Sequence, residues 1–431
     1  MYFARRRYNP MQPTLLELSK VYQKASSRSV FFSLLTLGVL SRIIWISLVD
    51  TSPVSDTMVY LSRAMSIAAG EGYVYPDGKP TAYWPVGYPA FLGSVLWLAQ
   101  GSLLAGKLVN IVLYIVTAFI FFRIARLYQK TGIGLFIIGY LSLSPNHIAY
   151  ANLYASEPLA LFFVSLVVYL LIRIVKQSSA KLIICAALAT AFGAFVKPQI
   201  VIFPGAVLLL FALLHRRPAH LGHLAIIALT TIVMVIPWGL RNYEHFDAVV
   251  PVSNNGGINL YIGNNPHASG GYKYDDEVVA PLEGLDETER DKKAKKLAIE
   301  FIRDEPVTFI KMIPLKLIAL YKTDAEGIAW NLEGIESPSQ LEKSSLHVAK
   351  WAAQIPYMLL VVLAVPCVIY TARQCLKTQS YSQFIPVLAV FAGTFVYMVF
   401  FGTTRFHFVF LPFLFFYIDY AFGSLRQEAR T

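Results

Sequence analysis

The sequence predicts an all-α polytopic membrane protein, and three observations carry this prediction. Of its 431 residues, 56% are hydrophobic and only 15% are charged, a balance typical of membrane proteins rather than soluble domains. About ten apolar segments of roughly bilayer-spanning length recur along the chain. Lys and Arg gather in alternate connections between these segments, as expected of a multi-pass protein.

The apolar segments define the expected order of the helices. They lie at 29–49, 103–122, 132–149, 156–175, 181–196, 199–214, 222–240, 351–371, 383–401 and 406–423. Only Lys197-Pro198 separates the fifth from the sixth, so these are either two helices or one. Cys185, Cys367 and Cys375 lie in or beside apolar segments without the spacing of a metal or disulfide site.

The basic connections predict the orientation of the chain. With a cytoplasmic N-terminus, every second connection is basic and both long loops, 50–102 and 241–350, are external. The basic positions are Arg5, Arg6, Arg7, Lys20, Lys24, Arg28, Arg123, Arg126, Lys130, Arg173, Lys176, Lys181, Arg216, Arg217, Arg373, Lys377, Arg426 and Arg430. The net charge of +11 is thus explained by loops, and we expect no nucleic-acid partner. We also expect no cleavable signal peptide, because the N-terminus is polar for about thirty residues.

Four parts follow from this topology: a cytoplasmic segment 1–28, a transmembrane catalytic module 29–240, an external region 241–350 and C-terminal transmembrane helices 351–425. In the external region, Asp286 to Glu289 has the spacing of a capping box, and an amphipathic helix follows until Pro306. The apolar segment 307–321 contains Lys311, Pro314 and Lys316, and we interpret it as interfacial. Asn-Gly and Asn-Pro pairs between 254 and 266 indicate turns around a short strand.

The stretch from Ser55 to Pro89 follows the first apolar segment, and its Pro, Gly and polar residues end the membrane pattern. We predict a short helix with Asp56 as an acidic N-cap and Gly70 as its stop. Asp56 and Tyr60 are four residues apart and share one helix face. Asp56 either caps this helix, serves as the chemical centre of an enzyme, or does both.

Other ionisable residues are expected on the same external side. Glu157-Pro158 begins the fourth apolar helix, where an acid and a proline also suit a helix N-terminus. Lys197, Arg241 and Arg405 lie at external helix ends. They are interfacial anchors or phosphate ligands, and their position against the usual charge bias favours phosphate binding.

The chain resembles the GT-C membrane glycosyltransferases, in the branch of the protein O-mannosyltransferases and aminoarabinose transferases. The resemblance rests on an acid after the first transmembrane segment and on several further motifs. These are Tyr60, Gly70-Glu71-Gly72-Tyr73, Pro80-Thr81-Ala82-Tyr83-Trp84-Pro85-Val86-Gly87-Tyr88-Pro89, Trp238-x-x-Arg241-Asn242, and Asn255-Gly256 followed by Gly263-Asn264-Asn265-Pro266. Together they cover most of the chain from about 30 to 420.

The resemblance implies a multi-pass enzyme of a cell membrane, the bacterial inner membrane, with its active site on the periplasmic side. It implies transfer of one sugar from a polyprenyl-phosphate donor to an acceptor that is a lipid, a glycan or a protein of the cell envelope. In the family, an acid at the position of Glu157 contributes to acceptor contact or to metal binding. Ser55 stands where members carry a second acid, so a divalent metal held by Asp56 and Glu157 is an open alternative.

For such a reaction we expect Asp56 as the general base and Glu157 as a second catalytic acid. Lys197, Arg241 and Arg405 would stabilise the phosphate leaving group, with inversion at the anomeric carbon. The other predicted substrate-binding residues are Tyr60, Tyr83, Trp84, Tyr88, Asn254, Asn264 and His407. The aromatic residues among them also suit an interfacial belt.

Two rival functions fit parts of the pattern. A transporter or flippase for a lipid-linked anion would also use external cations, but no internal repeat is visible and the clear intramembrane charge is Arg42. In a non-catalytic assembly subunit, Asp56 would be a helix cap and nothing more.

Overall fold

A computed structural model describes residues 15–215, 217–378, 384–418 and 421. These residues form helices and turns, and the one β-bridge among them joins Val74 and Pro80. The all-α prediction is confirmed. In a bilayer this is the expected outcome, since a helix satisfies its own backbone hydrogen bonds where water is absent.

Five described helices are long and apolar enough to cross a membrane. They lie within α1 (Leu15–Leu48), α4 (Leu103–Leu127), α7 (Glu157–Lys176), α10 (Ala219–Phe246) and α16 (Gln340–Thr378). A sixth candidate combines α5 (Thr131–Leu143) with the segment Pro145–Asn152, which contains α6 (Pro145–Ala149), across a bend of 59°.

The remaining predicted segments are shorter or interrupted. α8 (Ala180–Val196) and α9 (Ile202–His215) are separate helices, joined through Lys197 and the 3-10 turn Pro198–Val201, and α17 (Ile385–Val399) has 15 residues. The segment 406–423 is not one helix, because it begins with the 3-10 turns Thr404–Val409 and Leu411–Phe413 and is helical at 414–418. Within the described chain, five helices, or six with the bent pair, are therefore long enough to cross a membrane, fewer than the ten or so expected.

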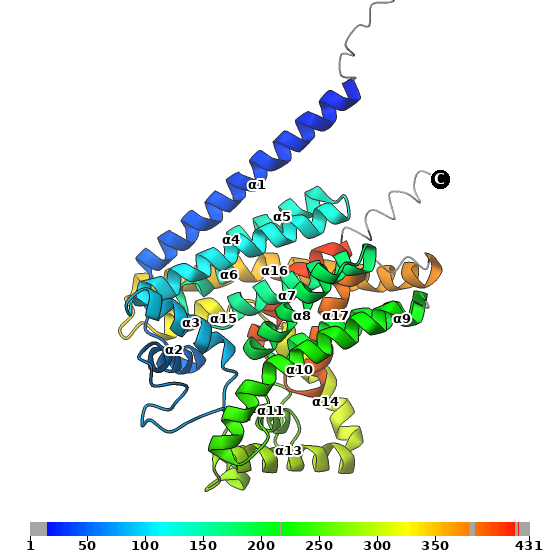
Figure 1. The fold of residues 1–431 in the computed structure, drawn as a ribbon. Coiled ribbons are helices and arrows are strands. Elements are labelled where there is room, and N and C mark those ends of the chain that lie inside the picture. The colour runs from blue at the N-terminus through cyan, green and yellow to red at the C-terminus, as the bar shows by residue number, and fades with distance from the viewer. Residues whose placement is uncertain (1–14, 216, 379–383, 419–420, 422–431) are drawn as a thin grey trace, which may run out of the picture.

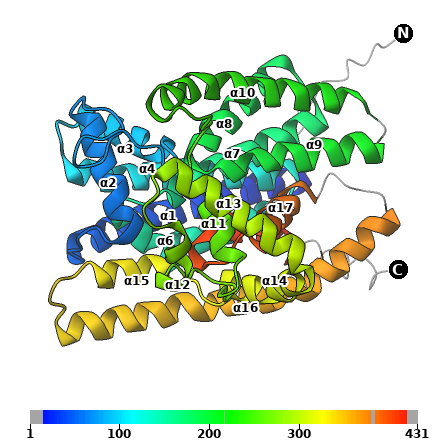
Figure 2. The ribbon, with the colours of Figure 1, turned by 90° about the horizontal axis from the view of Figure 1, so that it is seen from below.

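The elements separate into two ends (Figures 1 and 2). The turn between α4 and α5, the adjoining ends of α9 and α10 and the last part of α16 lie together on the right of Figure 1. α2 (Ser55–Ala68), α3 (Gly87–Leu98), α11 (Gly256–Gly263) and α13 (Glu287–Asp304) lie at the opposite, left and lower side. This arrangement agrees with the predicted grouping of basic connections at one end and long loops at the other.

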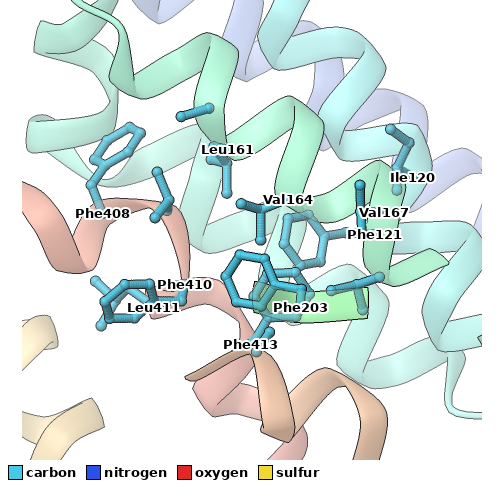
Figure 3. Packing of buried hydrophobic residues seen from close by; sticks show 14 of the residues in the cluster. Ile120, Phe121, Leu161, Val164, Val167, Phe203, Phe408, Phe410, Leu411 and Phe413 are labelled. Carbon is cyan, nitrogen blue, oxygen red and sulfur yellow. The ribbon is translucent and has the colours of Figure 1, made fainter. Parts of the chain in front are cut away.

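The hydrophobic core is centred on α7. Figure 3 shows Val164 and Val167 of α7 among Phe121 of α4, Phe203 of α9 and Phe413 of the C-terminal turns. The apolar window of α7 is 61% buried, whereas that of α10 is 11% buried and therefore turned outward. A helix held on all sides is a rigid support, and its first residue is Glu157.

Residues 241–350, which were predicted to be external, include a small hydrophobic core of their own around α11 and α13. Asp286 caps α13 by accepting hydrogen bonds from the backbone N–H groups of Thr288 and Glu289, as its capping-box spacing predicts. The strand expected around 254–266 is wrong, because these residues form α11. Its first N–H groups, from Gly257 and Ile258, donate to the Asp291 carboxylate of α13, a partner that local sequence does not reveal. α12 (Asp276–Val279) packs into the same small core as α11 and α13. α14 (Pro306–Tyr321) contacts α17 and the turn Thr404–Val409, whereas α15 (Glu326–Glu333) packs against α6 and α16.

Candidate active site

Asp56 lies in the first turn of α2, but it is not the N-cap. The N-cap is Val54, and the Thr57 hydroxyl bonds both the N–H and the C=O of Val54. The carboxylate of Asp56 instead forms an ion pair with the guanidinium of Arg405, and both side chains are largely buried. Residue Ser55 just before it has φ +49°, in the left-handed region. Left-handed non-glycine residues are strained and concentrate at functional sites.

Arg405 belongs to the 3-10 turn Thr404–Val409, which follows α17. Its guanidinium lies 5.5 Å from the ring centre of Trp330 and 5.2 Å from that of Phe406. Burial opposes the charged form of Arg405, but the carboxylates of Asp56 and Glu157 outweigh this effect and raise its pKa above the ordinary value. Arg405 is therefore a permanent cation between two acids.

Glu157 and Lys197 form a second ion pair beside the first. Glu157 is the first residue of α7 and Lys197 follows the last residue of α8, so the pair bridges two neighbouring helix ends at 3.1 Å. The side chain of Glu157 is 2% exposed and that of Lys197 is 12% exposed. The ammonium group also lies 5.5 Å from the Phe406 ring centre, next to Arg405 in the chain. Two carboxylates and two cations thus surround one turn.

An aromatic wall stands on one side of these pairs. The ring of Tyr60 lies 6.0 Å from that of Trp84 and 5.2 Å from that of Tyr88, and Tyr83 contacts Trp84 at 5.1 Å. Burial first, and then the charge of Asp56, raises the pKa of Tyr60, which therefore stays protonated. The hydroxyl groups of Tyr88 and Tyr150 are buried without a hydrogen-bond partner among the described residues. Both feel the charge of Glu157, so they are free donors close to the ion pairs.

Arg241 lies elsewhere. Its guanidinium donates to the backbone oxygens of Tyr73 and Thr81 at 2.8 Å each and stacks on Trp238 at 4.9 Å. It fastens α10 to the first external loop. The prediction that Arg241 shares one phosphate with Lys197 and Arg405 is not supported by these contacts.

Three further residues predicted to bind substrate, Asn254, Asn264 and His407, are buried and contact other parts of the same chain. Asn254 donates to Glu287 and Thr288, while Asn264 donates to the Leu260 and Val399 carbonyls and accepts from Lys316. His407 is fully buried between other side chains. Their placement corrects the expectation that they contact a sugar directly, since amide and imidazole groups at the surface of a protein look identical in sequence to those that hold its interior together.

Two acids that the sequence does not single out organise the neighbourhood. Glu287 accepts hydrogen bonds from the Tyr75 and Thr81 hydroxyls and the Ala82 N–H, at 2.8–2.9 Å, and so clamps the first external loop onto α13. Asp324, between α14 and α15, is buried beneath the turn of Arg405. The capping box marks Glu287 only as part of a helix start, and no local pattern marks Asp324.

The groups around Asp56 and Glu157 show whether these two carboxylates could bind a metal ion. Each carboxylate faces a cation, Arg405 or Lys197. No third His, Cys, Asp or Glu joins them into a metal-binding group within the part of the chain that the structure describes. Asp56 and Glu157 therefore do not fit a two-carboxylate metal site.

Comparisons with known proteins address the fold. The profile of the dolichyl-phosphate-mannose-protein mannosyltransferase family matches residues 84–240. Two crystal structures of the Archaeoglobus fulgidus oligosaccharyltransferase, one in complex with zinc and sulfate and one tethered to an acceptor peptide, superpose with TM-scores of 0.54 and 0.55 at 12% identity. The matches cover 93% and 95% of this chain but 49% and 50% of the oligosaccharyltransferase.

A third solved structure, ArnT from Cupriavidus metallidurans bound to undecaprenyl phosphate, is 12% identical with a TM-score of 0.43, over 95% of this chain and 79% of its own. A search of curated proteins finds no match. The chain thus spans about half the length of the oligosaccharyltransferase it superposes on. The matched family segment begins at Trp84 of the aromatic wall and includes both Glu157 and Lys197. The described chain therefore shares the helical fold of the Archaeoglobus fulgidus oligosaccharyltransferase structures.

Proposed function

We propose that the protein is a membrane glycosyltransferase that moves one sugar from a polyprenyl-phosphate donor to a hydroxyl-bearing acceptor at the external face. The observation that carries this proposal is the ion pair of Asp56 with Arg405, adjacent to that of Glu157 with Lys197. A base and fixed positive charge are the two components that the reaction needs, and both lie at the external ends of apolar helices.

The free site is electrically balanced, and the donor would change that balance. A donor phosphodiester carries one negative charge, and a guanidinium binds phosphate oxygens through two parallel hydrogen bonds. When the phosphate engages Arg405, it competes with Asp56 for the same N–H groups. Asp56 then loses its partner, and its carboxylate is free to accept a hydrogen bond from the acceptor. Donor binding would therefore prepare the base.

The chemical step follows from these positions. The acceptor oxygen forms a bond to the anomeric carbon while its proton passes to the Asp56 carboxylate. The bond from the anomeric carbon to the phosphate oxygen breaks, and its electron pair leaves with polyprenyl phosphate, which gains one negative charge. Arg405 and Lys197 stabilise that charge. Attack opposite to the leaving group, without a covalent intermediate, inverts the anomeric centre.

Glu157 would hold Lys197 and limit its motion rather than act as a second base. The hydroxyls of Tyr88 and Tyr150, which have no hydrogen-bond partner among the described residues, would donate to the sugar once the donor opens the site. The acceptor is a lipid, a glycan or a protein, and the site lies on the external side of the membrane. This mechanism uses no metal, because the carboxylates of Asp56 and Glu157 each face a cation.

The rival transport function is opposed by the state of Arg42. Its guanidinium donates to the backbone oxygens of Gly38 and Leu141 at 2.9 and 2.7 Å and stacks on Tyr114 at 3.7 Å. This charge is committed to helix packing. Proteoliposomes that contain a labelled polyprenyl-phosphate sugar separate the two functions. We expect protein-dependent formation of free polyprenyl phosphate when acceptor is added, and movement of intact donor between leaflets without bond cleavage would contradict the proposal.

A further inference from the structure

A buried polar cluster lies beneath the turn that carries Arg405, and the proposed reaction does not use it. Its centre is Asp324, which is 2% exposed. Its carboxylate accepts hydrogen bonds from the Tyr140 hydroxyl at 2.8 Å and the Asn146 amide at 2.5 Å, and His407 Nε2 lies 3.3 Å away. These partners come from α5, α6 and the turn of Arg405. Burying a carboxylate is costly unless such donors surround it.

His407 is held on all of its sides. Its Nδ1 lies 2.6 Å from the carbonyl oxygen of Leu320, and its Nε2 faces Asp324. Both ring nitrogens therefore face oxygen atoms of the surrounding chain. Tyr321 and Tyr357 stack on its two faces, with ring centres at 5.8 and 5.1 Å. The orientation of this imidazole is therefore fixed.

His407 is two residues from Arg405 on one short turn, so its position is transmitted to the site. The same turn is held at two further points. Thr404 donates its hydroxyl to Glu326 at 2.8 Å, and Phe406 stacks on Tyr397 at 4.4 Å. A 3-10 turn has little internal strength, so these side-chain anchors determine where Arg405 meets Asp56.

We propose that Asp324 is a positioning residue for the transfer reaction, acting through His407 on the guanidinium of Arg405. This inference rests on the proposed function. Small displacements of a charged group cost large factors in rate, about 10²-fold for roughly 1 Å. Loss of the Asp324 charge would release His407, let the turn relax, and weaken the grip of Arg405 on the departing phosphate. Asp324 itself touches no substrate.

The alternative is that Asp324 only stabilises the fold, and genetic coupling separates the two roles. A residue that acts through Arg405 has no further effect on rate once Arg405 is absent. A residue that only supports the fold lowers activity by the same factor in either background. The informative set is Asp324→Asn, Arg405→Ala and the double variant, each compared at equal amounts of folded protein.

We expect Asp324→Asn to lower the turnover number about 10–100-fold, with a smaller change in the acceptor KM, and to lower the residual rate of Arg405→Ala by less than about threefold. Equal losses in both backgrounds would overturn the proposal. Tyr114→Phe is the matched control, because it removes another buried hydrogen bond, to Ser142 at 2.7 Å, far along the chain from the turn. It should leave the turnover number within a few-fold of wild type.

Hydrogen exchange gives a readout that does not depend on activity. In Asp324→Asn, the amides of 404–409 should exchange at least about tenfold faster while those of α4 are unchanged. Unchanged exchange in the turn would overturn the positioning role even if transfer is never detected, whereas faster exchange in a protein without transferase activity would contradict only the proposed function. If Asp324→Asn does not fold, Tyr140→Phe removes one of the donors to Asp324 and should give the same pattern in weaker form.

Discussion

Removing Lys197 tests the charge arrangement of the site through stability as well as activity. In Lys197→Met, the carboxylate of Glu157 keeps its burial, 2% exposed, but loses the ammonium at 3.1 Å. Breaking a buried pair from one side costs about 3–5 kcal/mol, because an uncompensated charge is left behind. Arg405 also lies within electrostatic reach of Glu157, so we expect the lower end, about 3 kcal/mol.

The two halves of the pair should not respond equally. In Glu157→Gln, the remaining cation is 12% exposed and can turn its ammonium toward water, so the cost should be smaller, about 1–2 kcal/mol. In the double variant the uncompensated charge is absent. The double variant should therefore lose less free energy of unfolding than the two single variants lose together.

Thermal unfolding of the purified protein in one detergent measures this ranking. We expect Lys197→Met to lower the midpoint by about 3–6 °C, and Glu157→Gln and the double variant each to lower it less than Lys197→Met does. Donor KM measured on the same samples should rise in both variants that lack Lys197. If Lys197→Met is as stable as wild type, the buried ion pair as described here does not exist in the protein.

Three further predictions concern other parts of the molecule. Arg405→Ala should raise the donor KM or lower donor affinity by about 10–150-fold, the value of one charge-assisted phosphate contact at about 1.5–3 kcal/mol, and an unchanged donor affinity would exclude phosphate binding there. Glu287→Gln should speed hydrogen exchange at the backbone amide of Ala82, which donates to Glu287, whereas Glu289→Gln, at an exposed position of the same helix, should leave that exchange as in wild type. Burial lowers the pKa of Lys316 to about 8 from 10.5. Between those values unfolding takes up a proton, so the free energy of unfolding should rise with pH by up to about 3 kcal/mol. Lys316→Met should remove this rise in the unfolding midpoint, and an identical pH profile in both proteins would refute the assignment.

Hydropathy and charge bias predicted the order of helices and the grouping of the two long loops, because both signals are local and act through the solvent. The meeting of Asp56 with Arg405 was predicted only as far as placing them on one side of the membrane. They are far apart in the chain, and no single-sequence pattern tells which cation pairs with which acid.

Functional-group chemistry alone does not tell a ligand-binding amide from a structural one. Asn254 and Asn264 lie in the stretch whose sequence resembles the GT-C family, and both bond other parts of the chain, Asn254 to Glu287 and Asn264 to the Val399 carbonyl. Lys316 was expected at an interface and is instead fully buried. In each case the partner is on an element distant in sequence, so that tertiary contacts decide the role.

Local capping statistics also selected the wrong N-cap for α2. Asp is a favoured cap, yet the hydroxyl of Thr57 performs that function at Val54. The difference matters for function. The carboxylate of Asp56 is not used by the helix start and has Arg405, the proposed phosphate ligand, as its partner.

The transfer rate of Asp56→Asn tests the account most directly. Asn has the shape of Asp, and because Asp56 does not cap α2, the substitution leaves the helix start intact. It removes the base and the charge that faces Arg405. At matched levels of folded protein, we predict a loss of about 10²–10⁴-fold in transfer rate with donor binding retained, since Arg405 is then free for the phosphate. A transfer rate within a few-fold of wild type would contradict the account.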